Sequence, residues 1–237
     1  EKVTMKNMRT KLAVLLAAVM MVCSIALTGC QSKLVPADQV VGALYELTVK
    51  ENAVPVKDLL GFASEDDVRA SLLSDDYEDM SDMFKNEFSG MGIEFTDDEI
   101  KEMSDTMSKL LNKLSYTAEI QEEGKDETTV VLKVTGYSSD DMNQIMTDLM
   151  TEIQTNMDEE TLTALMTGDE EATMALMQDV IKQVVVKFGE MEPTTETTDV
   201  TVKCEKMKVE VSGKEKVSWM PSDMDKFVDD LENASFK

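Results

Sequence analysis

The hydrophobic pattern divides the chain into one long apolar run near its beginning and a body of shorter periodic segments. Residues 12–27 carry no charged side chain, and Lys6, Arg9 and Lys11 precede them. A basic segment followed by an apolar segment is typical of a signal peptide. As a helix the run would be about 24 Å long, less than the roughly 30 Å hydrocarbon layer of a membrane. We therefore favour a cleaved signal over an uncleaved membrane-spanning anchor.

Helical periodicity predicts four helices ahead of the first strands. One begins after Pro36 and places its apolar positions on one face: Val40, Val41, Leu44, Tyr45 and Leu47. Ser64 is placed to cap a second helix, and a third is predicted near residues 76–88. The clearest start is the capping box that runs from Thr96 to Glu99. The apolar residues of this fourth helix are Ile100, Met103, Met107, Leu110, Leu111 and Leu114.

From residue 115 the hydrophobic period changes to two, as in strands. Residues 116–137 predict a hairpin with Gly124 in its turn. A second hairpin is predicted over residues 200–220, with a turn at Gly213. In its first strand the expected inward positions change from even-numbered to odd-numbered residues. The first set is Val200, Val202 and Cys204, and the second is Met207, Val209 and Val211. We expect a bulge near Glu205 to reconcile the two sets.

Helical spacing returns in residues 139–188, and a last helix is predicted after Pro221. The apolar face of that last helix is Met224, Phe227, Val228 and Leu231. The order is therefore helices, hairpin, helices, hairpin, helix. Since no strand-helix-strand repeat demands a parallel sheet, we predict the α+β class, helix-rich, with an antiparallel sheet of about four strands packed against several helices.

Composition narrows the classes of function. The chain has 48 acidic and 23 basic residues, a net charge of −25, and no histidine. Such a surface repels phosphates, so we expect no nucleic-acid partner. Histidine is the side chain most often used as a general base near neutral pH and as a metal ligand. Its absence leads us to expect no catalytic residues and no metal site, and a protein that is not an enzyme.

Methionine pairs and acidic clusters offer candidate chemistry, but in both cases we favour a structural role. Met103 and Met107 have a spacing that would suit copper, yet they share a face with leucine and isoleucine, which indicates core packing. The same holds for Met142, Met146 and Met150. The acidic clusters at residues 75–79 and 168–171 lack the spacing of a calcium loop. We interpret them as solvated helix ends.

Cys204 and Trp219 are the other candidates for chemistry. No histidine is present to activate Cys204, so we predict a buried, inert thiol rather than a nucleophile. Trp219 is the only tryptophan, and we predict that it closes the core against the last helix. The alternative is that Trp219 stacks on a ligand at the mouth of the sheet.

The end of the apolar run, Leu27-Thr28-Gly29-Cys30, resembles the lipobox of bacterial prolipoproteins. In that family leucine stands three residues before the cysteine, and a small residue directly precedes it. The resemblance implies cleavage between Gly29 and Cys30 and covalent diacylglycerol on the sulfur of Cys30, with no other cofactor. Two acyl chains hold a protein stably, whereas one binds only reversibly. The protein would then be exported and anchored by lipid at the outer face of the cell membrane.

The body resembles small extracytoplasmic lipoproteins of Gram-positive bacteria whose domain of unknown function is expected to look like a cystatin or a nuclear-transport-factor cone. The resemblance rests on the opening helix at residues 43–50, the hairpin at residues 116–134 and the closing strand at residues 216–220. It spans most of residues 37–234 and implies no catalytic residue. Residues 139–188 are longer than a compact cone needs, and we treat them as a helical insertion.

These expectations define three segments and a first hypothesis for function. Residues 1–29 are a signal peptide, in which residues 1–4 are a start-site artefact. Residues 30–36 are the lipidated cysteine and a tether, and residues 37–237 are the extracytoplasmic domain. We expect a non-enzymatic binding or interaction module for an apolar small molecule, a peptide or a protein. The alternatives are the solute-capture subunit of a transporter and a hydrolase that relies on carboxylates alone.

Overall fold

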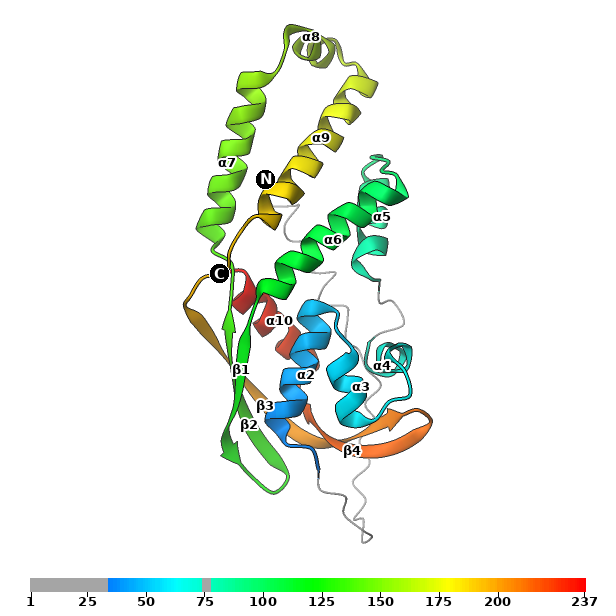
Figure 1. The fold of residues 1–237 in the computed structure, drawn as a ribbon, viewed down its shortest axis with the longest axis vertical. Coiled ribbons are helices and arrows are strands. Elements are labelled where there is room, and N and C mark those ends of the chain that lie inside the picture. The colour runs from blue at the N-terminus through cyan, green and yellow to red at the C-terminus, as the bar shows by residue number, and fades with distance from the viewer. Residues whose placement is uncertain (1–33, 74–77) are drawn as a thin grey trace. The chain divides into compact units, whose positions relative to one another are not determined.

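The computed structural model describes residues 34–73 and 78–237 of the chain (Figure 1). In these residues it has nine helices and one four-stranded antiparallel sheet, which confirms the predicted α+β class. The described residues form two compact units. The sheet unit comprises residues 34–73, 115–136 and 195–236, and the helical unit comprises residues 78–114 and 137–194.

The strands of the sheet unit lie side by side in chain order. They are β1 (Tyr116–Glu123), β2 (Glu127–Thr135), β3 (Thr197–Val211) and β4 (Lys214–Pro221). Every neighbouring pair is antiparallel, so both predicted hairpins are confirmed. The β3–β4 turn has positive φ at Ser212 (50°) and Gly213 (77°), as in the two-residue turns that match the twist of paired strands.

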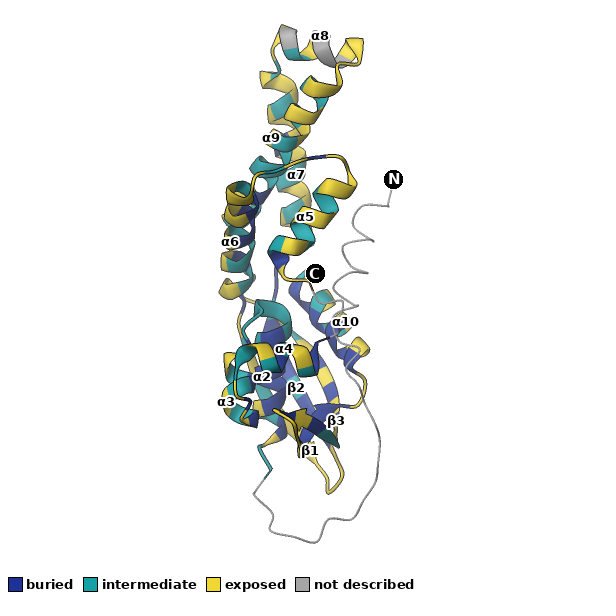
Figure 2. Ribbon diagram, turned by 90° about the vertical axis from the view of Figure 1, so that its right-hand side faces the viewer, coloured by how far each residue is buried: buried dark blue, intermediate teal, exposed yellow. Residues whose placement is uncertain are grey.

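Where β2 pairs with β3, one face of the sheet is buried and the other is more exposed. Val130 pairs with Val202 and Leu132 pairs with Val200, and all four side chains are buried. Lys133 and Thr201, of the opposite parity, are exposed. This alternation is the pattern of an antiparallel sheet with one face against the core. Helices α2 (Ala37–Lys50) and α10 (Met224–Ser235) both contact the sheet and each other, and Figure 2 shows them as largely buried.

The predicted bulge near Glu205 is wrong. The pairing of β3 with β4 runs without a shift from Cys204 to Val211, although the buried parity does change along β3. The change falls where β3 exchanges partners, because its first part pairs with β2 up to Glu205 and its second part pairs with β4. The register shift of this sheet lies in β1 instead, between Ile120 and Glu122.

Two short helices complete the sheet unit. Helix α4 (Glu65–Leu72) begins where predicted, and the Ser64 hydroxyl accepts a hydrogen bond from the Asp67 amide at 3.1 Å. Helix α3 (Val54–Leu60) was not predicted. It has seven residues and a proline at its start, so it offers too few turns for a recognisable period. Lys216 of β4 donates to the Leu60 carbonyl at 2.9 Å and so caps its end.

The helical unit contains five helices. They are α5 (Met80–Gly90), α6 (Asp97–Lys113), α7 (Ser139–Asn156), α8 (Glu159–Thr167) and α9 (Glu170–Gly189). The capping box of α6 is confirmed, since the Thr96 amide donates to the Glu99 carboxylate at 2.9 Å and the Glu99 amide donates to the Thr96 hydroxyl at 3.3 Å. No helix in the described part of the chain is long and apolar enough to cross a membrane.

The prediction that methionines pack in the core is only partly right. Met103 of α6 is buried, as are Met80, Met191, Met220 and Met224. On α7 and α9, however, Met150, Met174 and Met177 are exposed. The buried residue of α7 is Leu149, and that of α9 is Val185. These helices therefore have apolar faces that their neighbours cover incompletely, as the teal and yellow colours of Figure 2 indicate.

Candidate functional site

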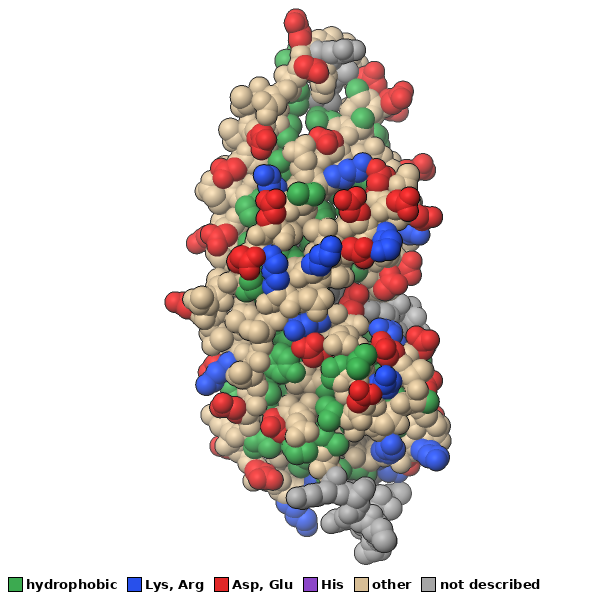
Figure 3. All heavy atoms as spheres, in the orientation of Figure 1, with side chains coloured by type: hydrophobic (Ala, Val, Ile, Leu, Met, Phe, Trp, Pro, Cys, Tyr) green, Lys and Arg blue, Asp and Glu red, His purple; other side chains and the backbone are tan. Residues whose placement is uncertain are grey.

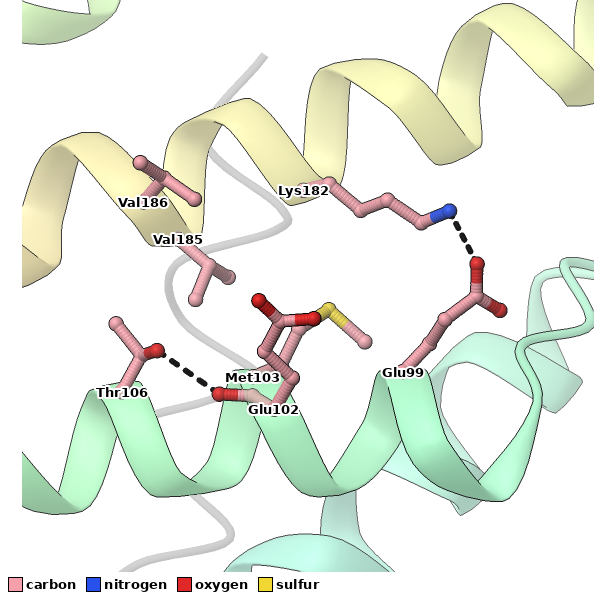
Figure 4. A pocket seen from close by; sticks show the side chains of 7 residues that line it. All are labelled: Glu99, Glu102, Met103, Thr106, Lys182, Val185 and Val186. Atoms are coloured by element: carbon pink, nitrogen blue, oxygen red, sulfur yellow. Dashed lines mark hydrogen bonds and ion pairs between the residues drawn. The ribbon is translucent and has the colours of Figure 1, made fainter.

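The candidate site is a small pocket between α6 and α9 in the helical unit, with a volume of about 200 Å³ (Figure 4). Its lining residues are Glu99, Glu102, Met103 and Thr106 of α6 and Lys182, Val185 and Val186 of α9. Small-molecule sites are usually larger, at about 300–1,000 Å³. The pocket therefore suits a small group or one side chain of a partner better than a whole cofactor.

The polar end of the pocket is an ion pair between Glu99 and Lys182. Glu99 belongs to the first turn of α6, where the capping box fixes its carboxylate against the Thr96 amide and hydroxyl. Its other oxygen accepts a hydrogen bond from the Lys182 ammonium group of α9. Lys182 also lies 5.8 Å from the centre of the Phe95 ring, a cation–π distance. The capping geometry thus orients the carboxylate that meets the other helix.

The pKa of Glu99 is lowered to about 2. The hydrogen bond from Lys182 contributes most, and the amide and hydroxyl of Thr96 add to it. All three donors stabilise the charged form of the carboxylate. At neutral pH Glu99 is therefore an anion that accepts hydrogen bonds and has no proton to donate.

Away from the ion pair the pocket lining is mixed, since Met103, Val185 and Val186 are apolar and Glu102 and Thr106 are polar (Figure 4). Met103 and Val185 are buried and pack with Ile100, and partly buried aromatic rings surround this cluster. The centres of Phe88 and Phe95 are 4.9 Å apart in an edge-to-face arrangement, and Phe84 stacks on Phe88 at 5.6 Å. The pocket therefore offers apolar contacts from Met103 and Val185 next to polar groups.

The lipobox lies outside the described residues. This holds for Leu27, Thr28, Gly29 and Cys30, so the cleavage site and the lipidation site remain predictions. The described part of the chain begins at residue 34, and α2 begins at Ala37. The folded body thus starts seven positions after Cys30.

The buried position predicted for Cys204 is confirmed. Its side chain is fully buried in the core of the sheet unit, where Val202 and Val130 belong to the same cluster. Burial raises the pKa of the thiol to about 12. A thiol with so high a pKa is protonated at neutral pH and is a poor nucleophile.

Trp219 is buried in the core of the sheet unit, together with Phe227 and Val228 of α10. Lys206, its neighbour on β3, lies 5.1 Å from the centre of the indole ring. Both observations agree with the predicted structural role, in which Trp219 closes the core.

One aspartate of each acidic cluster caps a helix. Asp79 accepts a hydrogen bond from the Asp82 amide at 2.9 Å, and Asp169 accepts one from the Ala172 amide at 3.1 Å. Within the described residues, no group of three or more histidine, cysteine or acidic side chains is arranged to hold a metal ion. The predicted interpretation as helix ends is therefore confirmed for these two aspartates.

Sequence reasoning found Glu99 as a capping residue but missed its partner. The signal for Lys182 lay in the charge pattern, because Lys182 is the first basic residue after Lys133. An isolated cation in a long acidic stretch has a carboxylate within reach in almost any fold. Which carboxylate it meets depends on how α6 and α9 pack, which the sequence pattern did not reveal.

The α+β fold of this chain is similar to a solved structure. That structure is YcdA from Bacillus subtilis, described as a candidate lipoprotein, with a TM-score of 0.52 and 16% sequence identity. The likeness covers 85% of this chain and 56% of YcdA, so the chain spans a little over half the length of that protein. At this identity the likeness shows a shared fold. No protein-family model matches the sequence, and the comparison with curated proteins finds no match.

Proposed function

We propose that this chain is an exported lipoprotein, anchored through diacylglycerol on Cys30, whose folded body binds another molecule without catalysing a reaction. The observation that carries the proposal is the sequence Leu27-Thr28-Gly29-Cys30 at the end of an uncharged run that follows three basic residues. The signal peptidase that acts on lipoproteins needs the small residue before the cysteine, and the acyl groups need its thiol.

The fold supports this proposal in two ways. YcdA, which has a similar fold, is described as a candidate lipoprotein. In addition, α2 begins at Ala37, so the tether after Cys30 has only a few residues. At about 3.3 Å per extended residue it would hold the body within roughly 20 Å of the membrane surface. The acidic surface of the body then opposes closer contact with anionic headgroups.

The chemistry of the α6–α9 pocket supports binding rather than catalysis. A carboxylic acid that acts as a general acid needs a raised pKa, whereas that of Glu99 is lowered to about 2. The thiol of Cys204 is buried and protonated. A small pocket that combines an ion pair with both apolar and polar side chains is suited to recognising part of a partner.

The proposal is tested by expressing the full chain in a Gram-positive host as the Cys30→Ala variant. We expect the variant to accumulate as uncleaved precursor without lipid, because the acceptor thiol is absent. Cys23→Ala is the matched control, since it removes a thiol from the apolar run and leaves the lipobox intact. Its cleavage and its labelling with radioactive palmitate should equal those of the wild type. Normal processing of Cys30→Ala would refute the proposal.

A further inference from the structure

The helices α7, α8 and α9, here called the acidic arm, carry an unusual distribution of charge. Between Lys133 and Lys182 the chain has eleven acidic residues and no lysine or arginine. Figure 3 shows acidic side chains along these helices. The arm therefore has no basic residue of its own over this stretch with which its acidic side chains could pair.

The same arm exposes large apolar side chains. Met166 and Leu162 of α8 are 82% and 49% exposed, and they lie four residues apart on one face of the helix. Met150 of α7 and Met177 of α9 are 45% and 40% exposed. Figure 3 shows hydrophobic side chains between α7 and α9, flanked by acidic ones. Apolar side chains grouped in this way usually mark a contact surface.

The negative charge and the exposed methionines of the arm together indicate what kind of partner it would bind. A second copy of the chain would bring eleven more acidic residues against the first eleven, and an anionic lipid surface would be repelled in the same way. A cationic partner would be attracted. Methionine is flexible and polarisable, so it adapts to apolar side chains of different shapes. An amphipathic helix with basic residues on one side presents both complementary features at once.

We propose that the acidic arm is a docking surface for a cationic amphipathic helix of a peptide or protein. The apolar face of that helix packs on Met150, Leu162, Met166 and Met177, and its basic residues face the surrounding carboxylates. The inference rests on the binding role in the proposed function, but it does not depend on the lipid.

The test uses the full chain in nanodiscs of phosphatidylcholine, with empty nanodiscs as the blank. The probe is a fluorescent peptide of leucine and lysine, about 18 residues or roughly 27 Å as a helix, with its leucines on one face. A peptide of the same composition in scrambled order is the control for the apolar face. We expect saturable binding of the first peptide, much weaker binding of the second, and an affinity that falls as salt is raised.

Two variants of the chain test whether the peptide binds at the acidic arm. In the arm variant, Leu162→Gln, Met166→Gln and Met177→Gln remove apolar surface without changing the charge. The control variant carries Val54→Gln, Met91→Gln and Val217→Thr, which alter exposed apolar side chains outside the arm. We expect the arm variant to bind about tenfold or more weakly, because the contact area that it loses is apolar. The control variant should bind like the wild type.

Three results would overturn the inference: no saturable binding at low salt, equal affinity for the scrambled peptide, or equal affinity of the arm variant. The Cys30→Ala chain is placed in the same nanodiscs through its uncleaved apolar run. It tests peptide binding without lipid and therefore distinguishes this inference from the lipoprotein proposal. If that chain binds the peptide but the wild type lacks lipid, only the anchor is wrong. If lipidation is normal and no peptide binds, only the docking surface is wrong.

Discussion

At the scale of single residues, Glu99 combines a local role with a long-range one. Its carboxylate completes the capping box of α6 with Thr96 and also pairs with Lys182, 83 positions later in the chain. The contact with Thr96 follows from the spacing of the two residues in the sequence, whereas the contact with Lys182 depends on how α6 and α9 pack. The shared consequence is a pKa lowered to about 2.

This pKa predicts how stability depends on pH. Because the fold lowers the pKa from its ordinary value of 4.5, the charge of Glu99 stabilises the fold fully above pH 4.5, and this contribution is lost as the pH falls toward 2. Glu99→Gln keeps a hydrogen-bonding group in the capping box but removes the charge. We expect it to lower the free energy of unfolding by at most about 1 kcal/mol at pH 7, as for a partly exposed pair.

Urea unfolding at several pH values measures the effect. The difference between the wild type and Glu99→Gln should shrink as the pH is lowered from 5 toward 2. Glu102→Gln is the matched control, because Glu102 lies one turn further along α6 and forms no salt bridge among the described residues. If the difference in unfolding free energy between the wild type and Glu99→Gln stays constant over this pH range, the lowered pKa of Glu99 is not its cause.

At the scale of elements, the close approach of the chain after β2 to the end of α10 requires a glycine at position 136. A Cβ atom at Gly136 would collide with the carbonyl oxygens of Ala234 and Ser235, which belong to the backbone and cannot move aside alone. Gly136→Ala should therefore lower the free energy of unfolding by about 1–3 kcal/mol, as overpacking does. Thermal or urea unfolding measures it.

Gly90→Ala is the control for this substitution. A Cβ at Gly90, the last residue of α5, would meet no atom within 4 Å. Its effect should be near zero or slightly stabilising, because alanine favours helix. Equal destabilisation by the two substitutions would show that the collision at Gly136 is not the cause.

The elements also show which features a sequence pattern can predict. The helix after Pro36, the capping box at Thr96 and both hairpins were predicted because local periodicity and local hydrogen bonds determine them. Helix α3 was too short to show a period. The expected bulge near Glu205 was wrong because β3 keeps its register with β4, so its two buried sets of residues lie on opposite faces of one strand. Periodicity alone does not reveal that the buried face of a strand can change along its length.

Packing between elements that are distant in the chain determines where the pocket forms and which methionines are exposed. The sequence pattern therefore did not predict either. Met103 and Met177 have similar spacing to their apolar neighbours, yet Met103 is buried and Met177 is exposed. The difference is that Met103 of α6 belongs to a cluster with Val185 of α9, whereas Met177, eight residues before Val185, does not belong to that cluster. Helical periodicity identifies an apolar face, but it does not say whether another element covers that face.

At the scale of the whole molecule, we propose a lipid anchor at Cys30 and a folded body with an acidic binding surface. The residues after Gly29 include 47 acidic and 19 basic ones, and in our proposal this charge repels anionic lipid and attracts cationic partners. A short tether would then keep the binding surface near the membrane, where cationic amphipathic segments accumulate. The anchor, and with it the place of the body near the membrane, depends on whether the chain is processed at Cys30.

Mass spectrometry of the mature amino terminus tests this central claim most directly. Trypsin cleaves after Lys33, so the first peptide of the processed chain would be Cys30-Gln31-Ser32-Lys33. The account predicts this peptide with diacylglycerol on the Cys30 sulfur, recovered from the membrane fraction. A mature chain that begins elsewhere, or that carries an unmodified Cys30, would contradict it.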